Sequence, residues 1–199
     1  VITYGSLVTA YTKCRDPDGA EAVLDEIKQQ RLEPDIVSYT ASIKALATRA
    51  VRSDVHRART LLNAARDQGL EPGLLSYNTL LKVLTRARDA AGTMELLSEM
   101  QRRGLQPDLV TYGTSMRMYA GRGDSAAAER LFSELQDRQL EPDLHVYGAL
   151  IQAIAATGQT SALDRAERLL VRARQQQLRP GVVVFATLMG AYARRGDVS

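Results

Sequence analysis

The chain has 199 residues, 45% of them hydrophobic, with 26 basic against 23 acidic residues, so it can form a sizeable core and carries little net charge. Its single cysteine, Cys14, excludes an intrachain disulfide and a zinc site built on cysteines. No apolar stretch approaches the roughly 18 residues that a membrane-spanning helix needs, so we expect no membrane partner.

Two helical segments are indicated at the start of the chain, at residues 3–14 and 17–30. The second has apolar residues at positions i, i+3, i+4 and i+7, which lie on one face of a helix. This pattern occurs four times, as Ala20, Val23, Leu24 and Ile27; Ala58, Leu61, Leu62 and Ala65; Ala128, Leu131, Phe132 and Leu135; and Ala166, Leu169, Leu170 and Ala173. A pair of helices therefore recurs along the chain.

Two ladders of residues mark the ends of this recurring pair. The first is an aromatic residue in similar settings, such as ITYG and VSYT, with spacings of 35, 38, 35, 35 and 38: Tyr4, Tyr39, Tyr77, Tyr112, Tyr147 and Phe185. The second closes segments such as LEPD and LQPD, at Asp35, Gly73, Asp108, Asp143 and Gly181. Together they predict the repeats 1–35, 36–73, 74–108, 109–143 and 144–181, and a partial sixth over 182–199. The sixth lacks its second helix, so we expect the natural protein to continue beyond Ser199.

Short polar or acidic residues precede the second helix of each repeat, where they can cap free backbone N–H groups. They are Asp16, Ser53 with Asp54, Asp89, Asp124 with Ser125, and Thr160 with Ser161. We expect the two 38-residue repeats to hold their three extra residues in this central turn. A lone hairpin cannot bury its apolar stripe, so neighbouring hairpins must stack. The predicted fold is all-α, an α-solenoid of antiparallel helical hairpins with a concave surface.

Charge is divided unevenly between the two helices of a repeat. The first helices with their following turns contain no acidic residue but twelve cations: Lys13, Arg15, Lys44, Arg49, Arg52, Lys82, Arg86, Arg88, Arg117, Arg122, Arg194 and Arg195. Abundant arginine and the helix dipole could account for Arg49 and Arg122. They do not account for the absence of acids, or for mid-helix Lys44 and Lys82. We therefore expect a positive first-helix wall that attracts a polyanion, and a negative second-helix wall.

The repeats resemble the pentatricopeptide repeat (PPR) family, with its V-T-Y-N opening and its closing G-hydrophobic-x-P-D. Examples are LLSYNTLLKVL from Leu74 and RRGLQPD ending at Asp108. The resemblance covers the whole chain and is to plain P-type repeats. It implies a right-handed superhelix and single-stranded RNA as partner, in a mitochondrial or chloroplast protein that acts in transcript stabilisation, processing or translation. PPR tracts are among the arrays that read about one base per repeat.

The resemblance also assigns site residues. The base-reading pairs are Gly5 with Asp35, Thr40 with Gly73, Asn78 with Asp108, Gly113 with Asp143, and Gly148 with Gly181, and Ala186 opens the sixth repeat. The base-sandwiching wedges are Ile2, Val37, Leu75, Val110 and Val183, with His145 in this place in the fifth repeat. The phosphate contacts are predicted from the basic first helices instead, at Lys13, Lys44, Lys82, Arg86, Arg117, Arg122 and Arg194.

The reading positions depart from the family pattern. Only Asn78 with Asp108 is a full family combination, and it implies uracil. Thr40 would favour guanine with a closing Asp, but Gly73 closes its repeat. Glycine fills three opening positions, which weakens the expectation of sequence-specific recognition.

Some of these residues have structural alternatives. The closing aspartates could cap the next first helix, and the aromatic ladder is expected to be core. Cys14, His56 and His145 fall on no shared motif, so we expect no metal and no catalytic site, hence no enzyme within these residues, and no cofactor or small-molecule substrate. The alternative function is an architectural subunit of an organellar ribosome or other large complex, which would grip protein or structured RNA.

Overall fold

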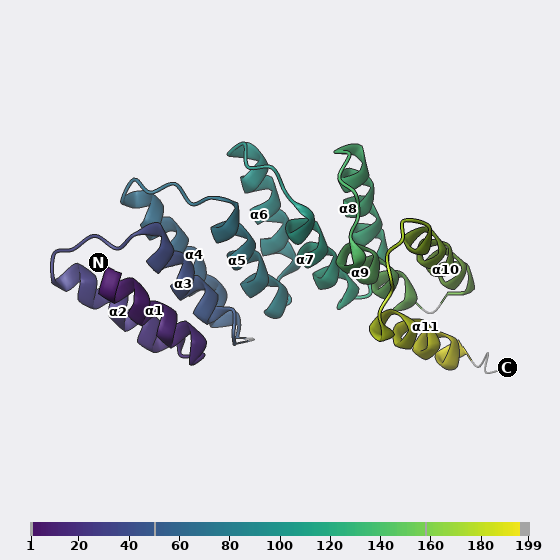
Figure 1. The fold of residues 1–199 in the computed structure, drawn as a ribbon, viewed down its shortest axis with the longest axis horizontal. Helices are drawn as coiled ribbons and strands as arrows, with labels where there is room; N and C mark the ends of the chain where they lie inside the picture. The colour runs from purple at the N-terminus through teal and green to yellow at the C-terminus, as the bar shows by residue number, and fades with distance from the viewer. Residues whose placement is uncertain (1, 50, 158, 196–199) are drawn as a thin grey trace. The chain divides into compact units, whose positions relative to one another are not determined.

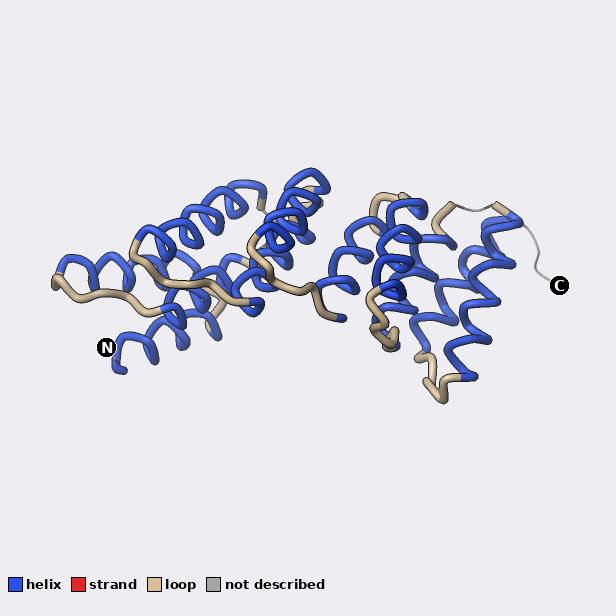
Figure 2. The backbone as a smooth tube through the Cα atoms, turned by 90° about the horizontal axis from the view of Figure 1, so that it is seen from above, coloured by secondary structure: helices blue, strands red, loops and turns tan. Residues whose placement is uncertain are grey.

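The computed structural model describes residues 2–49, 51–157 and 159–195, which contain only helices and no strand (Figures 1 and 2). The helices are α1 (Ile2–Lys13), α2 (Pro17–Gln29), α3 (Ile36–Leu46), α4 (Arg52–Asp67), α5 (Leu74–Arg86), α6 (Ala90–Arg102), α7 (Leu109–Ala120), α8 (Ser125–Asp137), α9 (Leu144–Ala155), α10 (Thr160–Gln175) and α11 (Val182–Arg195). The predicted all-α class is confirmed. The chain forms two compact units, the N-terminal unit Val1–Gln106 and the C-terminal unit Pro107–Ser199.

Within each unit, consecutive first helices pack against each other. In the N-terminal unit α1 contacts α3 and α3 contacts α5, while α2 and α4 each pack on their own first helix and on the next one (Figure 1). In the C-terminal unit the same arrangement joins α7 to α9 and α9 to α11, with α8 and α10 behind them. The first helices of a unit therefore form one wall and its second helices the other.

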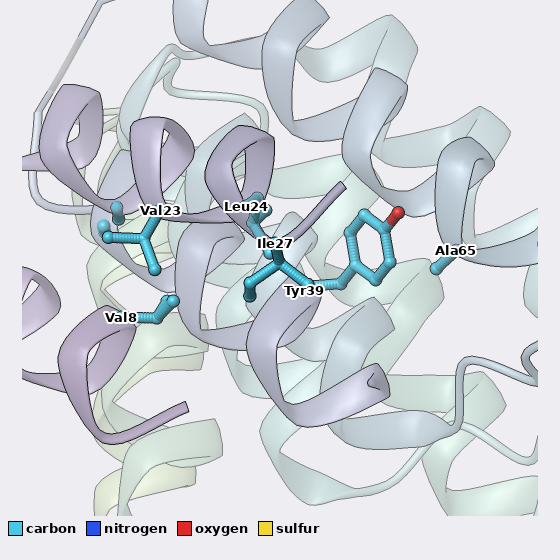
Figure 3. Close-up of a cluster of buried hydrophobic side chains, with 8 residues drawn as sticks. Val8, Val23, Leu24, Ile27, Tyr39 and Ala65 are labelled. Carbon is cyan, nitrogen blue, oxygen red and sulfur yellow. The ribbon is translucent and has the colours of Figure 1, made fainter. Parts of the chain in front are cut away.

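The four middle members of the aromatic ladder lie in the core, as predicted, and Tyr4 and Phe185 at its ends are half-buried. Tyr39, Tyr77, Tyr112 and Tyr147 are each no more than 1% exposed. Around Tyr39, the side chains of Leu24, Ile27 and Ala65 come from the second helices on either side (Figure 3). A cation from the end of the preceding second helix also lies over three of the rings: Lys28 over Tyr39 and Arg66 over Tyr77, both at 5.6 Å from the centroid, and Arg174 over Phe185 at 5.4 Å.

Whether a tyrosine hydroxyl of the ladder has a hydrogen-bond partner depends on the length of its repeat. In the 35-residue repeats a glutamate lies 22 residues after the tyrosine and accepts its hydrogen bond, at 3.4 Å for Tyr4 to Glu26, 3.1 Å for Tyr77 to Glu99 and 3.0 Å for Tyr112 to Glu134. Burial, and then the Glu134 carboxylate, raises the pKa of the Tyr112 phenol far above its ordinary value, so this donor stays protonated. The 38-residue repeats have Ala64 and Arg172 at the corresponding place, 25 residues after the tyrosine.

Accordingly, the buried hydroxyls of Tyr39 and Tyr147 have no hydrogen-bond partner among the described residues.

This difference predicts opposite effects of one substitution. Tyr112→Phe is expected to lower the free energy of unfolding by about 1–2 kcal/mol, because the Glu134 carboxylate loses a buried donor. Tyr39→Phe and Tyr147→Phe are expected to leave it unchanged or raise it by up to about 1 kcal/mol, because each removes a buried hydroxyl without a partner. Urea unfolding of the three variants measures this, and equal losses in all three would contradict the assignment.

The three extra residues of the long repeats lie in the second helix, which corrects the expectation that they fill the central turn. Helices α4 and α10 have 16 residues, against 13 in α2, α6 and α8. Three residues are close to one helical turn, so a longer helix leaves the apolar face downstream in register.

Capping of the second helices is confirmed in the 35-residue repeats and wrong in the long ones. The side chains of Asp16, Asp89 and Asp124 accept the expected backbone N–H bonds. In the long repeats the N-cap residues are Val51 and Gln159, without a side-chain bond. Ser53 with Asp54 and Thr160 with Ser161 instead lie inside the helix, and the side chain of Thr160 is outside the described residues.

Asp54 has a different role. It is fully buried and its carboxylate lies 3.0 Å from Arg49 Nη2 and 3.5 Å from Arg57 Nη1. Arg49 also reaches Asp18 at 3.2 Å. The Arg49 side chain is thus paired with carboxylates of α2 and α4, and its charge does not add to that of the first-helix wall.

Candidate nucleic-acid interface

The predicted base-reading positions lie where one first helix meets the next. The Thr40 and Ser76 hydroxyls of α3 and α5 are 2.7 Å apart. A Cβ atom added at Gly5, Gly113 or Gly148 would lie 3.8 Å from Ser38 Oγ, 3.6 Å from Val146 Cγ2 and 3.7 Å from Val184 Cγ2, which are ordinary contacts. Side chains at this position therefore stand between consecutive repeats, at the wall formed by the first helices.

Three surface hollows open at these junctions, and we call them slots 1, 2 and 5 after their repeats. Slot 1, of about 510 Å³, lies between α1 and α3 and includes Gly5, Thr9, Lys13, Asp35 and Val37. Slot 2, of about 380 Å³, lies between α3 and α5 and includes Val37, Thr40, Lys44, Gly73 and Leu75. Slot 5, of about 350 Å³, lies between α9 and α11 and includes Arg117, His145, Gly148, Gly181 and Val183. Each slot brings together a predicted reading pair, a wedge and a cation.

The wedge residues are apolar yet exposed. Val37 is 61% exposed, Leu75 73%, Val110 48% and Val183 77%. Val37 borders both slots 1 and 2, and Leu75 also borders slot 2, so the space of slot 2 lies between two aliphatic side chains. The side chain of Ile2 is outside the described residues. Exposed aliphatic groups repeated at one helical position indicate a binding surface rather than a core.

The cations predicted to contact phosphate form no ion pair with a described acidic side chain. Lys13, Lys44, Lys82, Arg117, Arg122 and Arg194 are exposed. Arg86 is also exposed, and its Nη1 donates to the Thr48 carbonyl at 3.1 Å. Their charge therefore remains available to an anion at the first-helix wall.

In the second helices, by contrast, several arginines are paired with acidic side chains. Ion pairs join neighbouring second helices, at 3.0 Å from Arg57 to Glu21, 3.1 Å from Arg59 to Glu95 and 3.0 Å from Arg165 to Glu129. The acids of that wall were expected to form a negative face, and part of their charge is neutralised by these arginines.

One acidic residue of this wall, Glu99, also accepts a hydrogen bond from the buried Tyr77. Burial opposes ionisation of Glu99, but the Arg66 charge and hydrogen bonds from Tyr77, Arg103 and Arg66 hold its pKa below the ordinary value. Glu99 therefore stays ionised at neutral pH and joins its own helix α6 to Arg66 of α4 and Tyr77 of α5.

The closing aspartates cap the first helix that follows them. Asp35 Oδ1 accepts from Ser38 N at 2.8 Å, Asp108 Oδ1 from Thr111 N at 2.8 Å, and Asp143 Oδ1 from Val146 N at 2.9 Å. The structural alternative is thus confirmed, and a contact between these carboxylates and a base stays a prediction. Gly73 is an N-cap without a side-chain bond.

The one full family combination spans the two units. Asn78 is buried on α5 of the N-terminal unit, and Asp108 precedes α7 in the C-terminal unit. Their joint role in reading uracil therefore stays a prediction. Gly113, Ala186 and the pairing of Gly113 with Asp143 fall at none of the three slots and also stay predictions.

Sequence reasoning named neither Thr9 nor Gln152 as a site residue, although both border a slot. Thr9 borders slots 1 and 2 and Gln152 borders slot 5, each four residues after the opening reading position of its repeat. Because residues i and i+4 lie on one helical face, the spacing could have identified both.

Two further features bear on function. None of the described helices is long and apolar enough to cross a membrane. In the described part of the chain, no three His, Cys, Asp or Glu side chains gather in a way that could hold a metal ion.

Stacked hairpins with a slot at successive first-helix junctions define an α-solenoid repeat protein. The pentatricopeptide repeat domain model matches residues 60–122, 95–157 and 130–195, and the PPR repeat family model matches residues 1–48. The chain belongs to the pentatricopeptide repeat family.

Solved structures share the fold. The pentatricopeptide repeat protein PPR10 in complex with an 18-nucleotide psaJ RNA element has a TM-score of 0.81 at 22% identity, covering 98% of this chain and 28% of that one. The PPR domain of Arabidopsis thaliana protein-only RNase P 1 in complex with tRNA has a TM-score of 0.76 at 14% identity, covering 94% of this chain and 95% of that one. For nuclear proteinaceous RNase P 2 of A. thaliana the values are 0.76 and 12%, with 96% and 42% covered. No curated protein matches the chain by sequence.

Proposed function

We propose that this tract binds single-stranded RNA along its first-helix walls, with one base in each slot and the phosphates on the neighbouring cations. The observation that carries the proposal is the composition of the slots. In slot 2, two exposed aliphatic wedges flank the Thr40 hydroxyl, and Lys44 stands one helical turn further along α3. An unstacked base needs such a combination of apolar flanks, a polar group for its edge and a cation for its phosphate.

Two of the similar structures support RNA as the ligand, since PPR10 was solved with an RNA element and protein-only RNase P 1 with tRNA. This chain spans 28% of the length of the PPR10 chain. We therefore propose separately what the complete protein that contains this tract does. We assign the tract a binding role without chemistry of its own, in a mitochondrial or chloroplast protein that acts in transcript stabilisation, processing or translation. The family resemblance supports that location.

The glycines limit how much sequence the tract can read. Gly5, Gly113 and Gly148 offer no side chain to a base edge, and Gly73 and Gly181 offer none from the closing side. Affinity then comes mainly from phosphate contacts and from packing of bases against the wedges, with strong selection confined to a few repeats.

A salt series tests this proposal. Neutralising about four or five phosphates predicts that log K for a single-stranded RNA falls with log salt at a slope of about −3. A duplex of the same sequence should bind more weakly, because its bases are stacked and cannot enter the slots. Fluorescence anisotropy at several potassium chloride concentrations gives both values. Binding that does not depend on salt, or an equal affinity for duplex, would contradict the proposal and favour a protein or structured-RNA partner.

A further inference from the structure

Slot 5 has no side chain at either reading position. Gly148 on α9 and Gly181 before α11 both lie at its border, whereas slot 1 has Asp35 and slot 2 has Thr40. A base that enters slot 5 therefore meets no hydrogen-bonding side chain where the other two slots provide one.

The next polar group along α9 is Gln152, one helical turn beyond Gly148. It is exposed and borders the same slot. The corresponding residues in slots 1 and 2 are Thr9 and Lys44. A lysine can only donate, whereas a glutamine amide both donates and accepts, so it can form two hydrogen bonds with one base edge.

The other groups of slot 5 suit a large base. His145 and Val183 occupy the two wedge places, so an imidazole ring provides a stacking surface on one side. The Thr187 hydroxyl donates to the Val183 carbonyl at 2.8 Å, so toward a base it can only accept. Arg117 offers donors only.

We propose that slot 5 selects adenine and that the Gln152 side chain forms the hydrogen bonds that select it. This inference rests on the proposed function. With glycine at positions 148 and 181, neither residue places a side chain between an entering base and Gln152. The two rings of a purine extend further toward Gln152 than the single ring of a pyrimidine. The amide matches the adjacent N6 donor and N7 acceptor of adenine. The same edge of guanine has two acceptors, N7 and O6, so the amide oxygen of Gln152 would find no donor there.

A scan of single substitutions in oligouridine tests the proposal. Adenine, guanine or cytosine is placed at each position in turn, and affinities are measured by anisotropy. Adenine is expected to strengthen binding by about tenfold over uridine at one position. Gln152→Ala should remove this preference, so that the ratio of the affinities for adenine-containing and plain oligouridine falls to about one.

Two further variants separate the reading role from general effects. Gly148→Asn should abolish the adenine preference by filling the slot, and the fold tolerates it because the added Cβ lies 3.7 Å from Val184 Cγ2. Gln175→Ala is the matched control, since this glutamine is exposed on α10 outside the slot, and it should keep the preference. Circular dichroism verifies that all variants fold.

The outcomes distinguish this inference from the function on which it rests. Oligouridine binding with no adenine preference, or a preference that survives Gln152→Ala, overturns the reading role alone. A guanine preference that disappears in Arg117→Ala overturns it as well and assigns the slot to Arg117. No binding to any of the oligonucleotides overturns the RNA-binding function and this inference with it.

Discussion

Replacing Lys82 and Arg86 together by glutamate is expected to weaken single-stranded RNA binding by at least about 100-fold, because like charges opposed across an interface cost several kcal/mol. Both side chains are exposed on α5, four residues apart and therefore on one helical face. Neither forms an ion pair with a described acidic residue, so reversing them breaks no such pair. Anisotropy at low salt measures the loss, and the salt slope should become shallower by about one to two, with two fewer phosphates neutralised.

The matched control is Arg102→Glu with Arg130→Glu. These arginines are exposed on the second helices α6 and α8, and their reversal changes the net charge by the same amount. Affinity should fall only slightly, since the second-helix wall carries no predicted RNA contact. If both double variants lose affinity equally, the effect belongs to net charge and the assignment of the binding wall is wrong.

The second large effect is expected from the wedges. Val37→Asp with Leu75→Asp should weaken RNA binding by about 10- to 100-fold, because packing against a base is worth about 1–3 kcal/mol and the new carboxylates repel phosphate. The free energy of unfolding should change by no more than about 0.5 kcal/mol per site, since both side chains are exposed. Anisotropy and urea unfolding of the same preparation measure the two quantities.

Val171→Asp serves as the control for these wedges. Val171 is 52% exposed on α10 of the second-helix wall, so its substitution has a similar chemical character at a place without a slot. It should leave RNA affinity unchanged. A large loss of stability in the wedge variant, or unchanged affinity, would mean that Val37 and Leu75 pack within the protein rather than against bases.

Much of the fold could be predicted from the sequence because the same helical pattern recurs in every repeat. The helices expected at 3–14 and 17–30 are found as Ile2–Lys13 and Pro17–Gln29. The four middle tyrosines of the aromatic ladder are buried, as their apolar neighbours indicated. The placement of three extra residues was predicted wrongly, because an insertion in the turn and an extra helical turn leave the same periodicity downstream.

The ladder's hydrogen bonds were missed although the signal is present. A glutamate follows Tyr4, Tyr77 and Tyr112 at a constant distance of 22 residues, but its meaning requires knowing that both helices face one core. The ion pairs between second helices, such as Arg57 with Glu21, depend on which side chains meet across repeats. A count of charges per segment cannot reveal that.

The candidate site was predicted in outline by resemblance, and its residues stay predictions. The positions that it named in the first, second and fifth repeats lie together at slots 1, 2 and 5, because the opening residue of a repeat lies against the next first helix. The residue one turn further on, which is Gln152 in slot 5, matters most where glycine leaves the reading position empty.

Ultraviolet crosslinking of a bound single-stranded RNA, with mass spectrometry of the crosslinked peptides, tests the RNA-binding wall most directly. Crosslinks are predicted at first-helix residues, chiefly those that border the slots, such as Val37, Leu75 and His145. They should diminish in Lys82→Glu with Arg86→Glu. Crosslinks concentrated on the second helices α4, α6, α8 and α10 would contradict the assignment of RNA to the first-helix walls.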